Sequence, residues 1–562
     1  MNRFFAFRVF PLVVAFMLSG AASSARSVWY VDDDAPGDPG PADPGISDPL
    51  EDGSPDHPFD AIQEGINAAV DGDLVLVRDG TYTGAGNREL DFGGRRITVR
   101  SENGSESCII DCQSGVYHAF YFHNNETSDA VVEGLAMQNS RYLPAFLIGG
   151  AAPAVRDCIF RGNYGLTGPG AVYVGDGNAS TVFWNCRFLG NSGQHYGAAQ
   201  AYGSQAAVAF VNCEFSGNSS LQYGGAASSR SGGDMSFVNC TFIGNSASQN
   251  GGAIYLDGSY TNVNLANCAF VGNQAGNHGG GICANTIYNE LFWVNLYNCT
   301  FAGNQAVLGR SVAEEPAAMG GGIWQSWNSI YWDGPDGFYW GSGGCSFGYC
   351  DVFGGVGGQG NIDADPLFVR APHPGPDGVW GTDDDDYGDE RLGPDSPCID
   401  AANSDELPAD VYDLDGDGDT GEPIPYDLDG RARLVDDPDV GDTGVGFPCV
   451  DMGPYEEQAS SDVASAEEGP VGAGISASPN PCHLGTVIWI DTPRARPLTL
   501  SVYDICGMPV RTISMGKIAA GRRSLSWDGR DEQGRMLPAG LYLVRLEDTG
   551  GSHRAVKVIL AR

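Results

Sequence analysis

The densest run of potential metal ligands lies in an acidic stretch near residue 415. Four aspartates alternate there with leucine or glycine, and a glycine occupies the sixth position of the loop: Asp413, Asp415, Asp417 and Asp419. Carboxylates with this spacing converge on a hard cation, which matches the start of a calcium loop. The twelfth position, where an EF-hand needs a bidentate acid, is Ile424. We therefore expect a looser Ca²⁺ loop, with a solvated acidic turn as the alternative.

A second set of residues suited to ligand contact is aromatic. The candidates for stacking on sugar rings are Trp324, Trp327, Trp332 and Trp340. Exposed rings in such a cluster would contact a glycan, whereas buried rings would form a hydrophobic lid over the end of a repeating domain. The sequence favours the lid, and both interpretations stay open.

Acidic and basic residues in the middle of the chain do not form the pattern of an active site. The acids between residues 130 and 310 are few and do not recur at a catalytic spacing: Glu133, Asp157, Asp176, Glu214, Asp234, Asp257 and Glu290 stand out. Hydrolysis of a glycosidic bond needs two carboxyl groups about 5–9 Å apart. His278 stands alone, and a lone histidine is more often structural than catalytic. We therefore predict no catalytic and no cofactor-binding residue, although carboxylates from different turns can meet in space.

An internal repeat must position all of these residues. The pattern C-x-F-x-G-N occurs six times, starting at Cys158, Cys186, Cys213, Cys240, Cys268 and Cys299. The spacings are 28, 27, 27, 28 and 31 residues, and each copy is followed by a Gly-rich element and a short alternating run. A short unit of strands cannot bury an apolar face alone, but stacked units can. The sequence therefore predicts an all-β fold, a right-handed parallel β-helix spanning residues 28–360, in which coils lie about 4.8 Å apart.

Stacking places equivalent residues of successive coils in columns. We expect an internal column of phenylalanines (Phe160, Phe188, Phe215, Phe242, Phe270 and Phe301) and a column of asparagines at a turn (Asn163, Asn191, Asn218, Asn245, Asn273 and Asn304). The six repeat cysteines should be buried free thiols, because parallel side chains hold their Cβ atoms too far apart for disulfides. The better candidate pairs are Cys398 with Cys449, Cys345 with Cys350, Cys108 with Cys112, and Cys482 with Cys506.

The repeats also support a family resemblance. F-x-x-N paired with G-G-A-[ILV] over residues 155–325 resembles the repeats of polymorphic outer-membrane proteins, a β-helical adhesin family. Those proteins end in a membrane barrel that this chain lacks, so autotransport is not implied. Residues 53–82 look like the N-terminal cap of secreted β-helix proteins, with a short helix over 61–70 covering the first coil.

Two further segments follow the repeats. Residues 361–457 carry 28 Asp or Glu and four Arg, and their motifs resemble the choice-of-anchor module of exported bacterial proteins: Asn361–Phe368, Ser396–Asp400, Asp427–Arg431 and Val450–Glu456. A Ser/Ala/Glu/Gly-rich linker is expected at 458–474. Alternating strands over 475–562 predict a small Ig-like β-sandwich, which resembles both the Ig-like domain of flagellar hook-cap proteins and the type A sorting domain of type IX secretion. The latter resemblance implies contact with a secretion machinery.

The N-terminus and the charge point to export. Residues 1–25 read as a signal peptide, with Arg3 and Arg8 before an apolar core and small residues at 23–25. No later segment is apolar enough to span a membrane. The net charge of −41 argues against nucleic acid as a partner. We expect an extracellular or cell-surface, non-catalytic protein that contacts a polysaccharide or a neighbouring cell surface; a lyase or hydrolase acting on acidic polysaccharide and a purely structural spacer are the alternatives.

Overall fold

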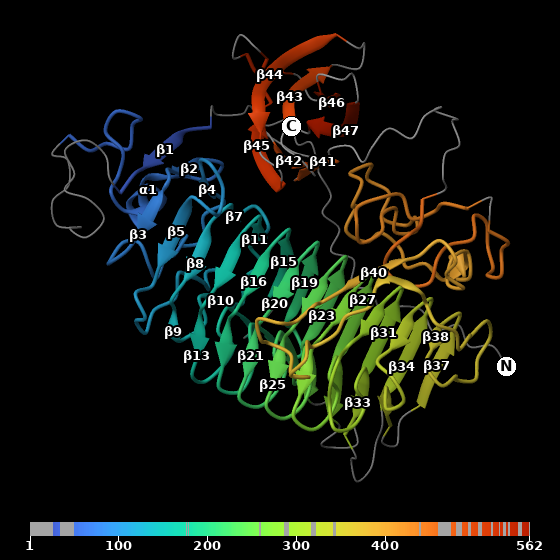
Figure 1. The fold of residues 1–562 in the computed structure, drawn as a ribbon. Coiled ribbons are helices and arrows are strands. Elements are labelled where there is room, and N and C mark those ends of the chain that lie inside the picture. Colours follow the sequence, from blue (N-terminus) through green and yellow to red (C-terminus); the bar gives the residue numbers. More distant parts are fainter. Residues whose placement is uncertain are drawn as a thin grey trace. The chain divides into compact units, whose positions relative to one another are not determined.

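Short parallel strands begin at residue 28 and continue to residue 352 in the computed structural model of the chain (Figure 1). The structure describes residues 26–33, 50–175, 177, 179–257, 260–285, 292–315, 322–340, 344–437, 440–458, 474–478, 486–492, 496–503, 508–518, 521–527, 529–531, 535–537, 540–548 and 553–560. The chain divides into two compact units, residues 1–460 and 461–562. The expected signal peptide and most of the expected linker lie outside the described residues.

Each coil of the first unit contributes one strand to each of up to four parallel sheets, which we name A to D. Sheet A contains β1 (Val28–Val31), β2 (Leu74–Val77), β4 (Thr98–Ser101), β7 (Val131–Glu133), β11 (Ala154–Arg156), β15 (Ser180–Trp184), β19 (Ala207–Val211), β23 (Asp234–Val238), β27 (Asn262–Ala266), β31 (Trp293–Tyr297), β34 (Ile323–Trp327) and β37 (Gly344–Gly348). Sheet B contains β3 (Gly80–Tyr82), β5 (Cys108–Asp111), β8 (Ala136–Gln138), β12 (Ile159–Arg161), β16 (Arg187–Leu189), β20 (Glu214–Ser216), β24 (Thr241–Ile243), β28 (Ala269–Val271), β32 (Thr300–Ala302), β35 (Ile330–Trp332) and β38 (Asp351–Val352).

The other two sheets are shorter. Sheet C contains β6 (Phe120–Phe122), β10 (Phe146–Gly149), β14 (Val172–Gly175), β18 (Ala199–Tyr202), β22 (Ala227–Arg230), β26 (Ile254–Asp257), β30 (Ile282–Asn285), β33 (Val312–Glu314) and β36 (Phe338–Tyr339). Sheet D contains β9 (Arg141–Tyr142), β13 (Tyr164–Gly165), β17 (Ser192–Gly193), β21 (Ser219–Ser220), β25 (Ser246–Ala247) and β29 (Gln274–Ala275). The helix α1 (Ile62–Ala68) buries Ile62, Gly65 and Ile66 against the first coils, as predicted for the cap. The parallel β-helix and the β-rich fold class are confirmed.

The interior is a continuous apolar core, because residues of each strand alternate between the inside and the outer face. The predicted phenylalanine column lies in it. Phe242, for example, is fully buried and stacks on Phe215 and Phe270 with ring centroids 5.1 and 4.5 Å apart. The column continues to Tyr331, which stacks on Phe301 at 4.9 Å.

The predicted asparagine column is also present and lies where sheet B turns toward sheet D. Asn218 is fully buried; its Oδ1 accepts hydrogen bonds from the backbone N–H and the Nδ2 of Asn191, at 2.9 and 3.1 Å. Its Nδ2 donates to the carbonyl oxygen of Phe188 at 2.8 Å and to Oδ1 of Asn245 at 2.9 Å. The preceding Gly217 has φ +62°, a conformation that glycine adopts without strain. Each amide therefore joins its own coil to both neighbours.

A second asparagine column was not predicted and makes the turn from sheet A to sheet B. Five members directly precede repeat cysteines, the sixth precedes Ser329, and all six have φ between +50° and +57°: Asn185, Asn212, Asn239, Asn267, Asn298 and Asn328. Asparagine tolerates this left-handed conformation better than other residues with a Cβ. Successive amides also hydrogen-bond, as from Asn298 Nδ2 to Asn267 Oδ1 at 3.0 Å. A single residue thus makes each corner.

The described cysteines are free thiols. This confirms the interpretation of the repeat cysteines, and burial raises the pKa of the Cys186 thiol, which makes it unreactive. The expected pairs within the described residues are wrong. Cys108 and Cys112 are four residues apart in one extended segment, too far to bond. Cys398 Sγ instead donates to Asp351 Oδ2, and Cys449 Sγ to the carbonyl oxygen of Asp400.

Two of the expected cysteine pairs are left to consider, Cys345 with Cys350 and Cys482 with Cys506. Cys350 Sγ donates to carbonyl oxygens, including that of Ser326 at 3.5 Å, and does not bond to Cys345. Cys482 and Cys506 lie outside the described residues.

The acidic segment wraps back over the outside of the β-helix. It contains the pair β39 (Phe368–Arg370) and β40 (Asp389–Leu392) and the short 3₁₀ helix Ser404–Glu406. Leu414 and Ile424 pack with outward-facing apolar residues of sheet A, and the indole N–H of Trp380 donates to the carbonyl oxygen of Gly303 at 2.6 Å. The segment is therefore part of the first compact unit.

The second unit contains two antiparallel sheets. One has the order β41–β42–β45 and the other β44–β43–β46–β47, with bounds β41 (Gly474–Ser478), β42 (Thr486–Thr492), β43 (Arg496–Tyr503), β44 (Pro509–Ile518), β45 (Gly521–Trp527), β46 (Gly540–Asp548) and β47 (His553–Leu560). Its core includes Leu500, Trp527 and Val544. The predicted sandwich is present. Among the described residues, none belongs to a helix that is long and apolar enough to cross a membrane.

The end of the predicted asparagine column, which runs from Asn163 to Asn304, gives a pH-dependent prediction. The carboxylate of Asp333 occupies the next rung: its Oδ1 accepts from the backbone N–H of Asn304 at 2.7 Å, and its Oδ2 from the Ser311 hydroxyl at 2.6 Å. Burial raises the pKa of Asp333 from 3.8 to about 6. The folded protein therefore favours protonated Asp333. The stabilisation that protonation gives to the fold is lost as the pH rises from about 4 through 6.

We expect Asp333→Asn to be more stable than the wild type by about 3 kcal/mol at pH 8, because roughly two pKa units correspond to about 3 kcal/mol. The difference should shrink toward zero at pH 4. Guanidinium unfolding at the two pH values measures it. Asp336→Asn, at an exposed aspartate of the same turn, is the control. A stability difference that does not change with pH would contradict the prediction.

Candidate functional site

The four tryptophans proposed for sugar stacking lie in packed surroundings. Trp324 has 1% of its surface exposed and belongs to the core, so its ring is not available to a ligand and that prediction is wrong for this residue. Trp340 packs on Trp324, with ring centroids 5.5 Å apart. Trp327 and Trp332 are half-buried against the cluster formed with the acidic segment. Their arrangement is that of a lid on the last coils.

A different surface, along sheet D, has the form of a groove. Two shallow hollows of about 310 and 360 Å³ follow each other along the coil stack. The first is lined by Tyr164, Ser192, Gly193, Ser219, Ser220, Leu221, Ser246 and Ser248, and the second by Gln274, Ala275, Gly276, Gln305, Ala306, Val307 and Arg310. The strands β13–β17–β21–β25–β29 pair in this order, so Ser246 of the first hollow lies beside Gln274 of the second. We call this surface the sheet D groove.

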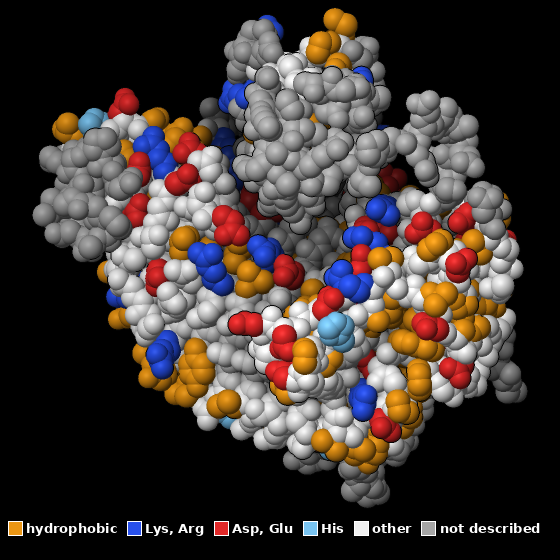
Figure 2. Space-filling model, in the orientation of Figure 1, with side chains coloured by type: hydrophobic (Ala, Val, Ile, Leu, Met, Phe, Trp, Pro, Cys, Tyr) orange, Lys and Arg blue, Asp and Glu red, His pale blue; other side chains and the backbone are white. Residues whose placement is uncertain are grey.

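The sheet D groove offers neutral hydrogen-bonding groups at the coil repeat. The outward residues of successive strands are half-buried and stand in register: Tyr164, Ser192, Ser219, Ser246 and Gln274. Leu221 is 60% exposed and Val307 71% exposed at the rim. The region around β21 and β25 is accordingly largely white in Figure 2, the colour of uncharged polar side chains and backbone. One chain of hydroxyls and amides therefore runs parallel to the β-helix axis.

The outer face of sheet C carries a second cluster, which is aromatic and charged. Arg230 donates to Asp257 Oδ2 at 2.7 Å, and its guanidinium lies over the Tyr196 ring at 5.3 Å. Tyr223 stacks on Tyr255 with centroids 4.5 Å apart. Burial raises the pKa of Tyr196 to about 12, so these phenols stay protonated. We call this set the tyrosine cluster.

A carboxylate and an imidazole border the tyrosine cluster. Glu315 Oε1 accepts from Asn250 Nδ2 at 2.5 Å and from the Tyr255 hydroxyl at 3.2 Å. Burial raises the pKa of Glu315 and lowers that of His278, whose Nδ1 lies 3.1 Å from Asn250 Oδ1. Sequence reasoning treated His278 as isolated. Only the stacking of distant coils reveals that an acid and a base share Asn250.

The acidic loop brings three of its four predicted ligands together. One oxygen each of Asp413, Asp415 and Asp417 lie within 4.8 Å of one another. Asp413 and Gly418 have φ of +53° and +88°, and Asp413 Oδ1 accepts from the N–H of Gly418 at 3.0 Å. Asp419 is not part of this group, and its Oδ1 accepts from the N–H of Gly421 at 3.0 Å.

Two acids that sequence reasoning missed complete the loop. Oxygens of Asp410, Asp415 and Glu422 also lie within 4.8 Å of one another. An antiparallel bridge between Ala409 and Pro423 places Asp410 opposite Glu422, and the N–H of Asp410 donates to the carbonyl oxygen of Glu422 at 2.7 Å. Burial raises the pKa of Asp410 to about 6. Glu422 could have been noticed in the sequence, because it is an acid two residues before Ile424, the position at which an EF-hand has its bidentate acid.

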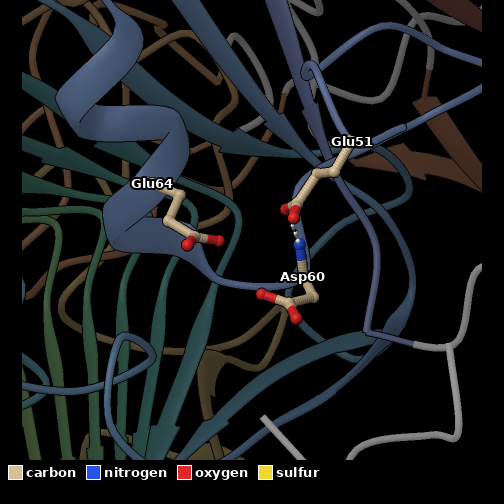
Figure 3. A group of neighbouring side chains, drawn as sticks. All are labelled: Glu51, Asp60 and Glu64. Atoms are coloured by element: carbon tan, nitrogen blue, oxygen red, sulfur yellow. Dashed lines mark hydrogen bonds between the residues drawn. The ribbon is translucent and has the colours of Figure 1, made fainter. Parts of the chain in front are cut away.

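Another acidic cluster lies in the N-terminal cap. Glu64 of α1 faces Asp60 and Glu51, and one oxygen of each lies within 4.8 Å of the others (Figure 3). Glu51 Oε1 accepts from the N–H of Asp60 at 2.9 Å. Burial, with the neighbouring acids, raises the pKa of Glu64 to about 7. A further group, Asp400 with two neighbouring aspartates, lies in the acidic segment.

Comparison with known proteins agrees with both domains. Residues 96–332 match the family model of the right handed beta helix region, and residues 488–552 match the FlgD Ig-like domain. Among curated proteins, none matches the chain. These matches establish a right-handed β-helix and a FlgD-like Ig domain.

Several solved structures are similar at low identity. A pectate lyase, Pel9A, is 15% identical over 69% of this chain and 94% of its own, with a TM-score of 0.34. A rhamnogalacturonan lyase is 12% identical over 66% of this chain and 97% of its own, with a TM-score of 0.36. FlgD from P. aeruginosa is 22% identical over 16% of this chain and 77% of its own, with a TM-score of 0.13.

Proposed function

We propose that this chain is an exported surface protein whose β-helix binds an extended polysaccharide along the sheet D groove without cleaving it. The observation that carries the proposal is the register of neutral polar side chains along that groove, from Tyr164 to Gln274. An extended polymer lying parallel to the axis would meet a similar set of donors and acceptors at each coil.

The chemistry of the lining supports saccharide contact. Serine hydroxyls and glutamine amides can donate to and accept from sugar hydroxyls. The exposed side chains of Leu221 and Val307 offer apolar contact to the C–H faces of a sugar, and the half-buried ring of Tyr164 offers an aromatic one. A shallow groove of this type gives many weak contacts, which suits adhesion to a repeating polymer.

The lining also favours binding over cleavage. Hydrolysis of a glycosidic bond requires two positioned carboxyl groups. The groove instead supplies hydroxyls, amides and one guanidinium, that of Arg310.

Placement outside the cell is part of the proposal. The signal-peptide pattern of residues 1–25 supports export. The match of residues 488–552 to the FlgD Ig-like domain supports a sorting or anchoring role through contact with a secretion machinery. The resemblance of residues 361–457 to the choice-of-anchor module supports attachment at the surface. The resemblances to the choice-of-anchor module and to polymorphic outer-membrane proteins also belong to this proposal, because both families are exported or located at the cell surface.

A groove-filling substitution tests the proposal. Ser219→Tyr places a ring in the middle of the groove, and we expect it to weaken binding to a retained polysaccharide at least tenfold. Ser216→Tyr, on sheet B of the same coil, is the matched control and should bind as the wild type does. Affinity electrophoresis against pectin, alginate and neutral glucans gives the dissociation constants. Equal binding by Ser219→Tyr and the wild type, or no retention on any polysaccharide, would contradict the proposal.

The carboxylate and the imidazole that border the tyrosine cluster favour a second candidate, a polysaccharide lyase. Glu315 with a raised pKa and His278 are suitable for acid–base chemistry. The same polysaccharides are therefore incubated with the chain while reducing ends and the absorbance of unsaturated products are followed. Product formation that Glu315→Gln abolishes would establish this second function in place of the first.

A further inference from the structure

The acidic segment docks on sheet A through residues that flank the acids of the loop. Tyr412 and Leu414 follow Asp410, Ile424 follows Glu422, and all three pack in one cluster with outward residues of sheet A: Val182, Trp184, Val211, Val238 and Ala266. The rings of Tyr412 and Trp184 meet edge to face at 6.3 Å. The two arms of the loop are thus held on the β-helix side by side.

Asp410 lies between these arms with a buried carboxylate that is only partly hydrogen-bonded. Its exposed fraction is 1%, and its Oδ2 accepts from the N–H of Leu414 at 2.7 Å. The other oxygen, Oδ1, is buried and has no hydrogen-bond donor within the described residues; the same holds for Oε1 of Glu422. An unsatisfied buried carboxylate oxygen is costly, and a bound ion is one arrangement that relieves the cost.

The geometry around Asp410 also suits a cation. Asp410 and Glu422 stand opposite each other across the Ala409–Pro423 bridge, where two like charges repel. Asp415 points into the same space, with all three ligand oxygens within 4.8 Å of one another. Two oxygens that bind the same Ca²⁺ are separated by at most about 5 Å, since each Ca–O distance is about 2.3–2.6 Å. Carboxylate oxygens as the donor set select a hard divalent cation.

We propose that Asp410, Asp415 and Glu422 bind a divalent cation, Ca²⁺ by preference, and that this ion fixes the two arms through which the acidic segment docks on sheet A. Asp415 also belongs to the outer group with Asp413 and Asp417, so the predicted loop and the inner site share one ligand. Asp419 is not a ligand of the inner site. The ion is then a clamp between the segment and the β-helix.

Calcium titration of residues 26–562 tests the site. After treatment with EDTA, Ca²⁺ is added in a calorimeter, and Tb³⁺ luminescence sensitised by the nearby Tyr412 and Tyr426 reports the same site. We expect Asp410→Asn and Glu422→Gln each to weaken the inner site at least tenfold, while Asp419→Asn leaves it unchanged. Retained affinity in both of the first two variants, or no binding by the wild type, would overturn the proposal.

Hydrogen exchange tests whether binding of the ion also stabilises the two docked arms. The N–H groups of Leu414 and Ile424 donate to Asp410 Oδ2 and to the carbonyl oxygen of Pro408. We expect Ca²⁺ to slow exchange of a peptide covering 408–426 at least tenfold in the wild type and in Asp419→Asn, and to have no effect in Glu422→Gln. Circular dichroism confirms that each variant is folded. Binding of Ca²⁺ without slower exchange would remove the clamp.

Discussion

Replacing Asn218 with leucine is expected to lower the free energy of unfolding by about 3–9 kcal/mol, since each of three buried polar groups left without a partner costs about 1–3 kcal/mol. Leucine has a similar volume, so the change removes hydrogen bonds rather than packing. Three buried groups lose their partner: the N–H and the Nδ2 of Asn191, and the carbonyl oxygen of Phe188. The effect is large because one amide joins three coils.

An exposed asparagine provides the control for this experiment. Asn264 lies on the outer face of β27, where its Oδ1 accepts from Asn295 Nδ2 at 2.9 Å in contact with solvent. Water replaces that hydrogen bond, so Asn264→Leu should change stability by less than about 1 kcal/mol. Guanidinium unfolding followed by far-UV circular dichroism measures both variants. Equal losses for the two would show that the asparagine column containing Asn218 does not hold the coils together.

The inner columns could be predicted because the repeat fixes them. A residue that recurs every 27 or 28 positions must face the same environment in each coil, so Phe242 and Asn218 identify one interior site and one turn. The second asparagine column has a similarly regular signal, since Asn212 and four of its equivalents directly precede repeat cysteines. What the pattern does not state is that a single left-handed residue can make the whole corner.

In the acidic loop, local sequence spacing predicts only some of the acids that come together. Spacing alone brought Asp413, Asp415 and Asp417 together, because residues in one tight loop are close in any fold. Asp410 and Glu422 depend on the bridge between Ala409 and Pro423, which no local motif encodes. Ile424 is apolar at the EF-hand position because it packs on sheet A and not because the loop lacks a further acid.

The stacking role of Trp324 and the cysteine pairs failed for a related reason, whereas the favoured interpretation of the tryptophans as a lid agrees with their packing. Composition showed a cluster of tryptophans, but not that Trp324 lies at an inward position of β34. The cysteine pairs were proposed without knowledge of where each thiol points. In the fold, the Cys398 thiol donates to the Asp351 carboxylate and the Cys449 thiol to the carbonyl oxygen of Asp400. The direction of a side chain follows from register, and register is a property of the assembled coils.

Replacing Phe242 with alanine is the second large effect that we expect, with a loss of about 3–5 kcal/mol in the free energy of unfolding. The ring is fully buried, stacks on Phe215 and Phe270, and meets Phe237 edge to face with centroids 5.1 Å apart. Removal leaves a cavity that stacked coils close poorly, because backbone hydrogen bonds to both neighbours fix the spacing of each strand.

The same substitution at an exposed ring distinguishes burial from ring chemistry. Phe353 is 41% exposed and contacts Trp332 edge to face at 5.1 Å. Phe353→Ala should therefore cost less than half as much as Phe242→Ala, because much of its surface is already in water. A near-neutral Phe242→Ala would place that ring at the surface and shift the register of every coil by one residue, since neighbouring residues of a strand face opposite sides. Such a shift would also move Asn218 out of the interior. The Phe242 and Asn218 experiments are therefore two independent tests of the same register.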